Sequence, residues 1–305
     1  MFDQIRDKFR QFQFNIYDNV IRLSYQRARL EKKKVAIDFG EIAMLTRSGA
    51  GVSAPTEPVM LLLHGFGSEK DTWLRFVELL HLPLPLVIPD LPGHGESTWD
   101  SEQDYSIHSQ AYRVHQMLVN LGITAVHIVG HSMGGAIALR LAHLYPEMVR
   151  SLVLISAAGA EIKPGRVGNV IDSRDLNPLV DVQNKADFQR LLDVCMHKHP
   201  YLPRIAFNVL AEKKIARFEM DKRIFSDMVT DLDQSAYLAQ LQLPVLIIWG
   251  DKDLVLDVAD AQFLHERING SEKIILNGIG HVPMLEEPQH TCRSVRDFFQ
   301  RYKIG

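Results

Sequence analysis

Val129-Gly130-His131-Ser132-Met133-Gly134-Gly135 is the segment from which the architecture of this chain follows. A β-branched stretch precedes it, and small residues with helical spacing follow it. A strand that turns sharply into a helix around Gly-x-Ser-x-Gly raises its serine above a sheet, and the flanking glycines leave room for the turn. The N–H of Met133 then lies at a helix N-terminus, which favours a developing negative charge. The segment predicts a nucleophilic Ser132; the alternative is a turn whose serine only caps the helix.

Outward from this segment, short apolar runs alternate with helical patterns. The runs are Val59–Leu63, Leu86–Ile88, Val149–Ile155 and Val245–Trp249, and each is apolar almost throughout. Strands without an exposed face are typical of a parallel sheet that is covered by helices on both sides. Residues 35–46 read as a preceding hairpin that turns at Gly40. The sequence therefore predicts an α/β fold with a mostly parallel sheet.

One long segment interrupts the alternation. Residues 158–241 are far longer than an ordinary strand–helix connection of about 2–6 residues, and their patterns are helical. We interpret them as an inserted helical cap over the carboxyl edge of the sheet, where α/β proteins bind their ligands. The core then consists of residues 35–157 and 242–305, and residues 1–34 form a separate N-terminal helical segment.

The N-terminal segment is amphipathic. Its apolar residues recur at steps of three and four, which places them on one helical face: Phe2, Ile5, Phe9, Phe12, Ile16, Val20 and Leu23. Residues 1–34 contain nine Lys or Arg against four Asp or Glu, and the basic residues concentrate towards Lys34. Such a helix is suited to lie in the plane of a membrane interface. The alternatives are a helix packed on its own domain or against a second subunit.

Composition narrows the class of protein. The 305 residues carry a net charge of −3, which gives no reason to expect a nucleic-acid partner. Cys195 and Cys292 lie far apart, so we expect two reduced thiols. No run is long and apolar enough for a membrane span, and no signal peptide is read at the N-terminus. We therefore expect a cytoplasmic protein that contacts membranes peripherally through residues 1–34, with its oligomeric state left open.

Four motifs in their order along the chain resemble the α/β-hydrolase family: His64-Gly65-Phe66-Gly67, Gly130-His131-Ser132-Met133-Gly134, Trp249-Gly250-Asp251-Lys252-Asp253 and Gly280-His281. The likeness covers about residues 35–302 and is greatest to monoacylglycerol-lipase-like and bacterial lipase-like members. It implies the α/β-hydrolase fold and a catalytic order of serine, acid, histidine. Ser132 is then the nucleophile, His281 the base and Asp253 the acid, with Asp251 as the competing acid.

The resemblance also implies the rest of the site. The N–H groups of Phe66 and Met133 form the expected oxyanion hole, and His64 braces its loop. Phe66, Val282 and Met284 are expected to bind the substrate, although Val282 and Met284 suit core packing as well. Neither a metal nor an organic cofactor is implied. A second polar cluster, made of Asp90, His94 and Ser97, has the spacing of a turn rather than of a triad.

The expected function is that of a serine carboxylester hydrolase acting on apolar acyl esters such as a monoacylglycerol, through an acyl-Ser132 intermediate. The small-molecule ester is the expected partner. Related alternatives are an acyl-thioesterase and a carbon–carbon bond hydrolase, although the latter usually carries a tryptophan where this chain has Val282. A small-molecule receptor that retains the triad is the alternative from another class.

Overall fold

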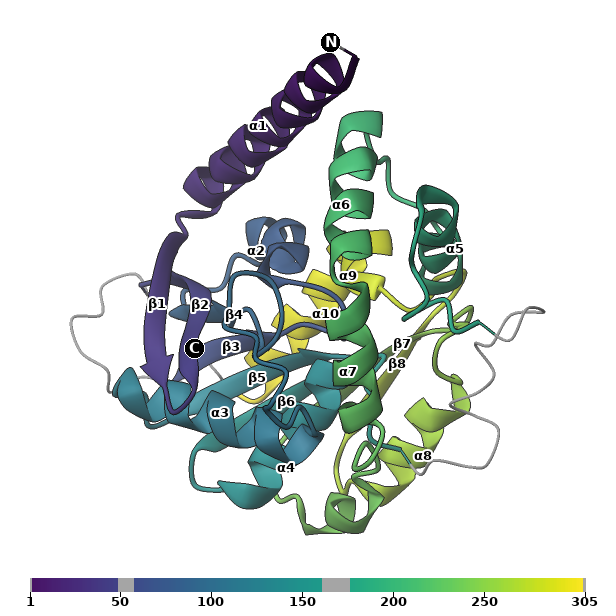
Figure 1. The fold of residues 1–305 in the computed structure, drawn as a ribbon. Coiled ribbons are helices and arrows are strands. Elements are labelled where there is room, and N and C mark those ends of the chain that lie inside the picture. The colour runs from purple at the N-terminus through teal and green to yellow at the C-terminus, as the bar shows by residue number, and fades with distance from the viewer. Residues whose placement is uncertain (1, 49–57, 161–175, 304–305) are drawn as a thin grey trace.

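A twisted sheet of eight strands runs through the centre of the computed structural model, which describes residues 2–48, 58–160 and 176–303 (Figure 1). The strand order is β1-β2-β4-β3-β5-β6-β7-β8. The strands are β1 (Glu31–Ile37), β2 (Gly40–Arg47), β3 (Val59–Leu63), β4 (Leu86–Pro89), β5 (Val126–His131), β6 (Val149–Ile155), β7 (Val245–Gly250) and β8 (Glu272–Leu276). Strands β3 to β8 pair in parallel, while β1 and β2 are antiparallel. The predicted α/β sheet is confirmed.

The first two strands form the expected hairpin with a small difference in the turn. Ile37 is paired with Gly40, so residues 38 and 39 make the turn and Gly40 is already the first residue of β2. Strand β2 also pairs with β4 in antiparallel fashion, which joins the hairpin to the parallel part of the sheet.

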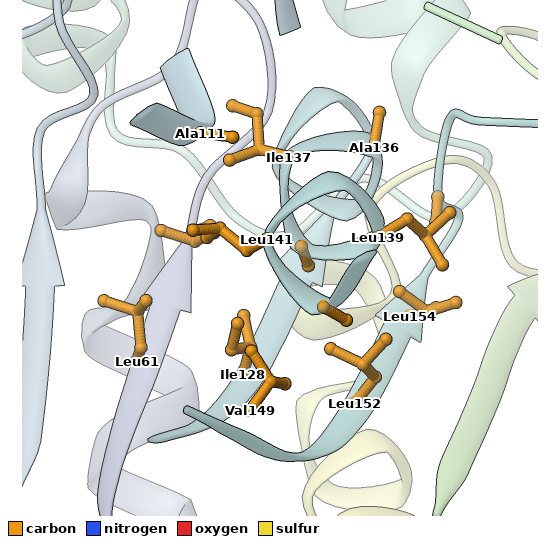
Figure 2. Close-up of a cluster of buried hydrophobic side chains, with 14 of the residues drawn as sticks. Leu61, Ala111, Ile128, Ala136, Ile137, Leu139, Leu141, Val149, Leu152 and Leu154 are labelled. Atoms are coloured by element: carbon orange, nitrogen blue, oxygen red, sulfur yellow. The ribbon is translucent and has the colours of Figure 1, made fainter. Parts of the chain in front are cut away.

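Helices cover both faces because the strands present apolar side chains alternately to either side. In β3, Leu61 and Leu63 belong to one core cluster, and Met60 and Leu62 belong to the other. The first cluster packs against α3 (Ile107–Asn120), α4 (Met133–Leu144) and α8 (Ala259–Arg267); Figure 2 shows its centre between α4, β5 and β6. The second packs against α2 (Leu74–Leu80), α9 (Pro283–Glu286) and α10 (Pro288–Arg301).

The described part of the connection from β6 to β7 includes the helices α5 (Lys185–Cys195), α6 (Arg204–Ala216) and α7 (Phe218–Met228), which lie together beside the sheet (Figure 1). Of the expected cap at 158–241, residues 161–175 lie outside the described residues. The short helix η2 (Ser235–Gln240) near its end packs against α4 and α8 of the core. The N–H of Gln234 donates to the carbonyl of Gly159 at 3.0 Å, so the two ends of the inserted helices are tied together.

Helix α1 (Phe2–Ala28) packs against α6 and α2 along one side. It ends earlier than the expected boundary at residue 34, because Glu31–Lys34 already pair with β2 at the edge of the sheet. Lys32 and Lys34 are ion-paired there with Glu96 and Glu41, at 2.8 and 3.2 Å. None of the described helices is long and apolar enough to cross a bilayer.

The apolar face that the sequence predicts for α1 is not the face that packs on the domain. Gln13, Tyr25 and Ala28 are the buried positions, and Arg10 pairs with Glu212 of α6 at 2.5 Å. The predicted face remains largely open to solvent, with its largest exposed side chains at Ile5, Phe9, Phe12, Val20 and Leu23; the side chain of Phe2 lies outside the described residues.

Candidate active site

The tight turn between β5 and α4 presents Ser132. This residue has φ 51° and ψ −118°, a backbone conformation that is strained for any residue with a side chain. The turn is possible because its glycines touch backbone: a Cβ on Gly130 would lie 2.5 Å from the oxygen of Gly134, and one on Gly134 would lie 2.3 Å from that of Leu63. Ser132 is partly exposed, whereas the residues of α4 that follow are buried. The turn therefore offers one hydroxyl at its tip.

His281 and Asp253 come from the loops after β8 and β7, at the same carboxyl edge of the sheet as Ser132. The Nδ1 of His281 lies 2.8 Å from Oδ2 of Asp253, and both side chains are buried. Burial alone raises the pKa of Asp253, but the contact with His281 and the N–H groups of Leu256 and Val255 outweigh it and hold that pKa below its ordinary value. Asp253 is thus ionised at neutral pH and oriented from both sides.

The competing acid has a different surrounding. Asp251 accepts a hydrogen bond from the N–H of Gly278 at 2.6 Å, and its carboxylate lies 3.3 Å from Nζ of Lys252. It braces the loop after β8, and the carboxylate that meets the His281 ring is that of Asp253.

The backbone of His281 is held by hydrogen bonds at both its carbonyl and its N–H. His131, next to the serine, has Nε2 2.8 Å from the carbonyl oxygen of His281. Burial, followed by the nearby His281, lowers the pKa of His131 to about 3, so this ring is neutral and donates the hydrogen bond. The N–H of His281 donates to the carbonyl of Cys195 at the end of α5, at 2.9 Å.

Glu286 on α9 holds the same loop. Its buried carboxylate accepts from the N–H groups of Gly280 and Val282, which flank His281, at 2.9 and 3.0 Å. It also accepts from the N–H groups of His197 and Lys198, at 2.9 and 2.8 Å. One carboxylate therefore joins the histidine loop to the chain that leaves α5. This role was not predicted from the sequence, in which the only signal is an acidic residue directly after Met284 and Leu285.

The loop after β3 forms the other wall. The N–H of Ser68 donates to the carbonyl of Gly65 at 3.3 Å, and Gly67 at the turn has φ 66°. His64 is buried and donates from Nδ1 to the carbonyl of Gly65, while its Nε2 accepts from the N–H of Leu91. Burial lowers the pKa of His64, which keeps it neutral in this bracing position. A Cβ on Gly65 would lie 3.1 Å from Cβ of Ser132, so the loop passes directly over the serine.

Phe66 and Met133 are the residues whose backbone N–H groups are expected to form the oxyanion hole. Met133 is the first residue of α4, so the helix leaves its N–H without an internal acceptor. The Phe66 ring packs edge-to-face on Phe225 of α7, with 5.4 Å between centroids, and the Nζ of Lys214 lies 5.2 Å from its centroid. Lys214 comes from α6, three residues after the buried Ala211, and a lysine on that packed face is the signal the sequence offered.

The second polar cluster has the contacts of a buried turn. Asp90 accepts from Nζ and N–H of Lys70, both at 2.7 Å, and Ser97 donates to the carbonyl of Asp90 at 2.6 Å. His94 is buried with its Nδ1 3.2 Å from the carbonyl of Pro92. These contacts tie the loop after β4 to the helix η1 (Lys70–Trp73) that follows the oxyanion loop.

Two of the three residues expected to bind substrate, Val282 and Met284, lie in the core. Met284 is fully buried and Val282 is 9% exposed, and both belong to the cluster that packs between the sheet and α10. Both side chains pack within the core, and their contact with substrate stays a prediction. Across the described residues, no group of three or more His, Cys, Asp or Glu is arranged to hold a metal ion.

Known proteins are similar to this chain over most of its length. Residues 58–288 match the family described as alpha/beta hydrolase fold. Lipase 1 of Psychrobacter immobilis is 32% identical over 290 residues, which cover 93% of this chain and 89% of that protein. Monoacylglycerol lipase ABHD6 of Rattus norvegicus is 31% identical over 260 residues, covering 79% and 75%. The crystal structure of a membrane phospholipase A, a bacterial virulence factor, superposes with a TM-score of 0.88 at 32% identity, covering 96% and 93%.

Proposed function

Because the chain belongs to the alpha/beta hydrolase fold family, as a lipase-type hydrolase of carboxylic ester bonds, we propose that its acyl transfer runs through Ser132, His281 and Asp253. The observation that carries this assignment is the 2.8 Å contact between Asp253 and Nδ1 of His281, beside a strained and partly exposed serine. With Nδ1–H donated to the carboxylate, the neutral ring keeps its lone pair on Nε2, which is the base that a serine hydroxyl requires.

The reaction then has two halves. The Oγ of Ser132 attacks the ester carbonyl while Nε2 of His281 takes the hydroxyl proton, and the imidazolium returns that proton to the leaving alcohol as the C–O bond breaks. Water attacks the acyl-serine in the second half, gives a proton to His281, and the acid product leaves as the serine oxygen is reprotonated. The N–H groups of Phe66 and Met133 stabilise the oxyanion in both halves.

We propose an apolar acyl ester, of which a monoacylglycerol is one example, as the substrate, and the helices of the β6–β7 connection as the cap that selects it. Support comes from the names of the lipase relatives and from the apolar contact of Phe66 with Phe225 beside the oxyanion loop. The acyl-thioesterase and carbon–carbon hydrolase alternatives share the same triad chemistry, so they differ only in which acyl donor is turned over.

A series of acyl donors tests the proposal. The purified protein is assayed on p-nitrophenyl esters and monoacylglycerols of rising chain length, on matched acyl thioesters, and beside its Ser132→Ala variant. We expect multiple turnover on esters with kcat/KM rising from short to longer acyl chains, and none above background for the variant. A single stoichiometric burst would indicate a receptor, and preference for thioesters would overturn the assignment of the substrate.

We also propose that the exposed apolar stripe of α1, which is the predicted face described above, lies in a membrane interface. Its exposed members include Phe9 and Phe12, which are 60% and 56% exposed. Because Lys32–Lys34 belong to β1, the helix itself carries five Lys or Arg against three Asp. Apolar burial is therefore the main source of affinity and charge a minor one. Binding at the interface would bring the enzyme to a substrate that partitions into the membrane. The cytoplasmic location stays a prediction.

Two aromatic truncations test this membrane contact. Phe9→Ala with Phe12→Ala keeps helix propensity and the packed face, and we expect vesicle co-sedimentation to weaken by roughly tenfold or more. Tyr201→Ala removes a side chain that is 92% exposed elsewhere, and it should bind as the native protein does. Turnover of a water-soluble ester should be unchanged in both. A shift from dimer to monomer with unchanged vesicle binding would identify the stripe as a subunit contact instead.

A further inference from the structure

A buried ion pair joins two cap helices above the oxyanion loop. Lys214 of α6 and Asp221 of α7 are both buried, and Nζ of the lysine lies 2.7 Å from Oδ2 of the aspartate. Burying a charge is costly unless it is paired, so the pair fixes α6 against α7. The sequence analysis gave neither residue a role.

The cluster around this pair carries more positive than negative charge. Arg217 contacts the other oxygen of Asp221 at 3.0 Å and also donates to the carbonyl of Gly93 at 2.7 Å. Among the described residues, Asp221 is the only carboxylate within ion-pair distance of Lys214 or Arg217. Two cations therefore share one carboxylate in a region that water screens poorly.

The excess charge faces the oxyanion loop. The Nζ of Lys214 lies 5.2 Å from the centroid of the Phe66 ring, within the range of a cation–π contact. A Cβ on Gly67 would lie 2.4 Å from the same nitrogen, so the ammonium is packed against the backbone of the turn. The N–H of Phe66, one of the two proposed oxyanion donors, belongs to this turn.

We propose that Lys214 is a positioning residue for acyl transfer: it fixes the Phe66–Gly67 turn from the cap, and the excess charge that it shares with Arg217 favours the oxyanion. The inference rests on the proposed function of Ser132. It gives the cap a part in the chemistry, because the oxyanion loop is supported by α6 as well as by the core. Only interactions that strengthen in the transition state raise kcat, and an oxyanion carries charge that the ester does not.

Lys214→Met tests this role with Lys213→Met as the matched control one residue away. Since Arg217 still neutralises Asp221, the variant leaves no unpaired buried carboxylate and is expected to fold. We expect kcat on a soluble ester to fall by roughly 10- to 100-fold with KM changed by about twofold or less. The inhibition constant of a trifluoromethyl ketone, which forms an oxyanion adduct on the serine, should rise by a similar factor. Lys213 forms a partly exposed ion pair with Glu69 at 2.6 Å, so Lys213→Met controls for the loss of one ion pair from α6. It should change neither constant by more than about twofold.

Three outcomes overturn the proposal. They are an unchanged kcat in Lys214→Met, a lower kcat with an unchanged inhibition constant, and an equal effect in Lys213→Met. If the methionine variant unfolds at the assay temperature, Lys214→Gln and Lys214→Arg are tested instead. Lys214→Gln should bind the trifluoromethyl ketone more weakly than the native protein, and Lys214→Arg should recover part of the lost affinity. Absence of ester turnover in the native protein would instead refute the proposed function and is read separately.

Discussion

Replacing Glu286 by glutamine should disturb His281, the proposed catalytic base, through the backbone on either side of it. The carboxylate accepts four backbone N–H groups, three on Oε2 and one on Oε1. A glutamine has one acceptor oxygen, which can serve the three groups on the Oε2 side. Its NH2 then faces the N–H of Val282, so one buried donor loses its acceptor and the remaining three bonds lose their charge assistance.

These losses set the magnitude. A buried donor left unsatisfied costs about 1–3 kcal/mol, and the weaker remaining bonds bring the total to about 2–4 kcal/mol of unfolding free energy. In a chain of this size that corresponds to a decrease in Tm of roughly 3–8 °C. The loop on both sides of His281 is released, so we expect kcat to fall by roughly 10- to 100-fold while KM changes little.

Thermal unfolding and ester turnover at saturating substrate measure the two effects. The matched control is Glu287→Gln, because the adjacent Glu287 forms a partly exposed pair with Lys198 and should matter by about 0.5 kcal/mol or less. If the two variants lose stability and kcat to the same small extent, the hydrogen bonds of Glu286 do not position the loop that carries His281, and the prediction is wrong.

Three further predictions concern groups in and beside the site. Ser132→Ala keeps the Cβ and with it the strained backbone, so the Tm should stay near the native value. The substitution should lower turnover by roughly 10⁴-fold or more, and retention of a tenth of the activity would refute the nucleophile. Asp253→Asn should cost orders of magnitude in kcat through the wrong imidazole tautomer, whereas Asp251→Asn should cost little, and the reverse ranking in the same assay would move the acid. Burial, followed by Glu69, raises the pKa of Asp71 from an ordinary 3.8 to about 6. The folded state therefore binds the proton more tightly than the unfolded state, and this stabilisation is present below the ordinary value and is lost as pH rises through about 6. The Tm of Asp71→Asn relative to the native protein should accordingly increase between about pH 4 and pH 7, and a pH-independent difference would contradict the assignment.

The sheet and the serine turn are readable from the sequence because each depends on a local pattern, whereas Asp253 and His281 are predicted from the resemblance to the family. Continuous apolar runs mark buried parallel strands, and Gly130-x-Ser132-x-Gly134 is required by backbone contacts within the turn itself. The residues that hold the candidate site in place, Glu286 and Lys214, cannot be predicted from local patterns. Glu286 also holds the N–H groups of His197 and Lys198, and Lys214 lies against the Phe66–Gly67 turn, so both depend on residues far away in the chain. Apolar neighbours suggest that a charged residue is buried, but they do not say which partners it meets.

The N-terminal helix shows the same limit. Periodicity identifies its apolar stripe, and it also predicts a helix, which is confirmed. Periodicity does not say which face the domain takes. The contacts with α6 and α2 use a neighbouring face that contains Gln13 and Tyr25, and the hydroxyl of Tyr25 donates to Asp71 at 2.5 Å. Polar and aromatic residues such as Gln13 and Tyr25 therefore attach α1 to the domain, and a pattern of hydrophobic residues does not reveal them.

The hydrogen bond from Gln234 to Gly159 has a consequence for how new specificities arise in this architecture. Because the chain leaves and rejoins the core at this bonded point, we expect the segment between Gly159 and Gln234 to be exchangeable as one cassette. A longer or shorter cassette leaves the register of β6 and β7 intact, provided its two ends still meet. The cassette is not free of the chemistry, however, since it carries Lys214 and the carbonyl of Cys195. Transplanted caps should therefore yield soluble proteins more often than active ones, and those that recover activity should bring a cation and a carbonyl acceptor to the same two loops.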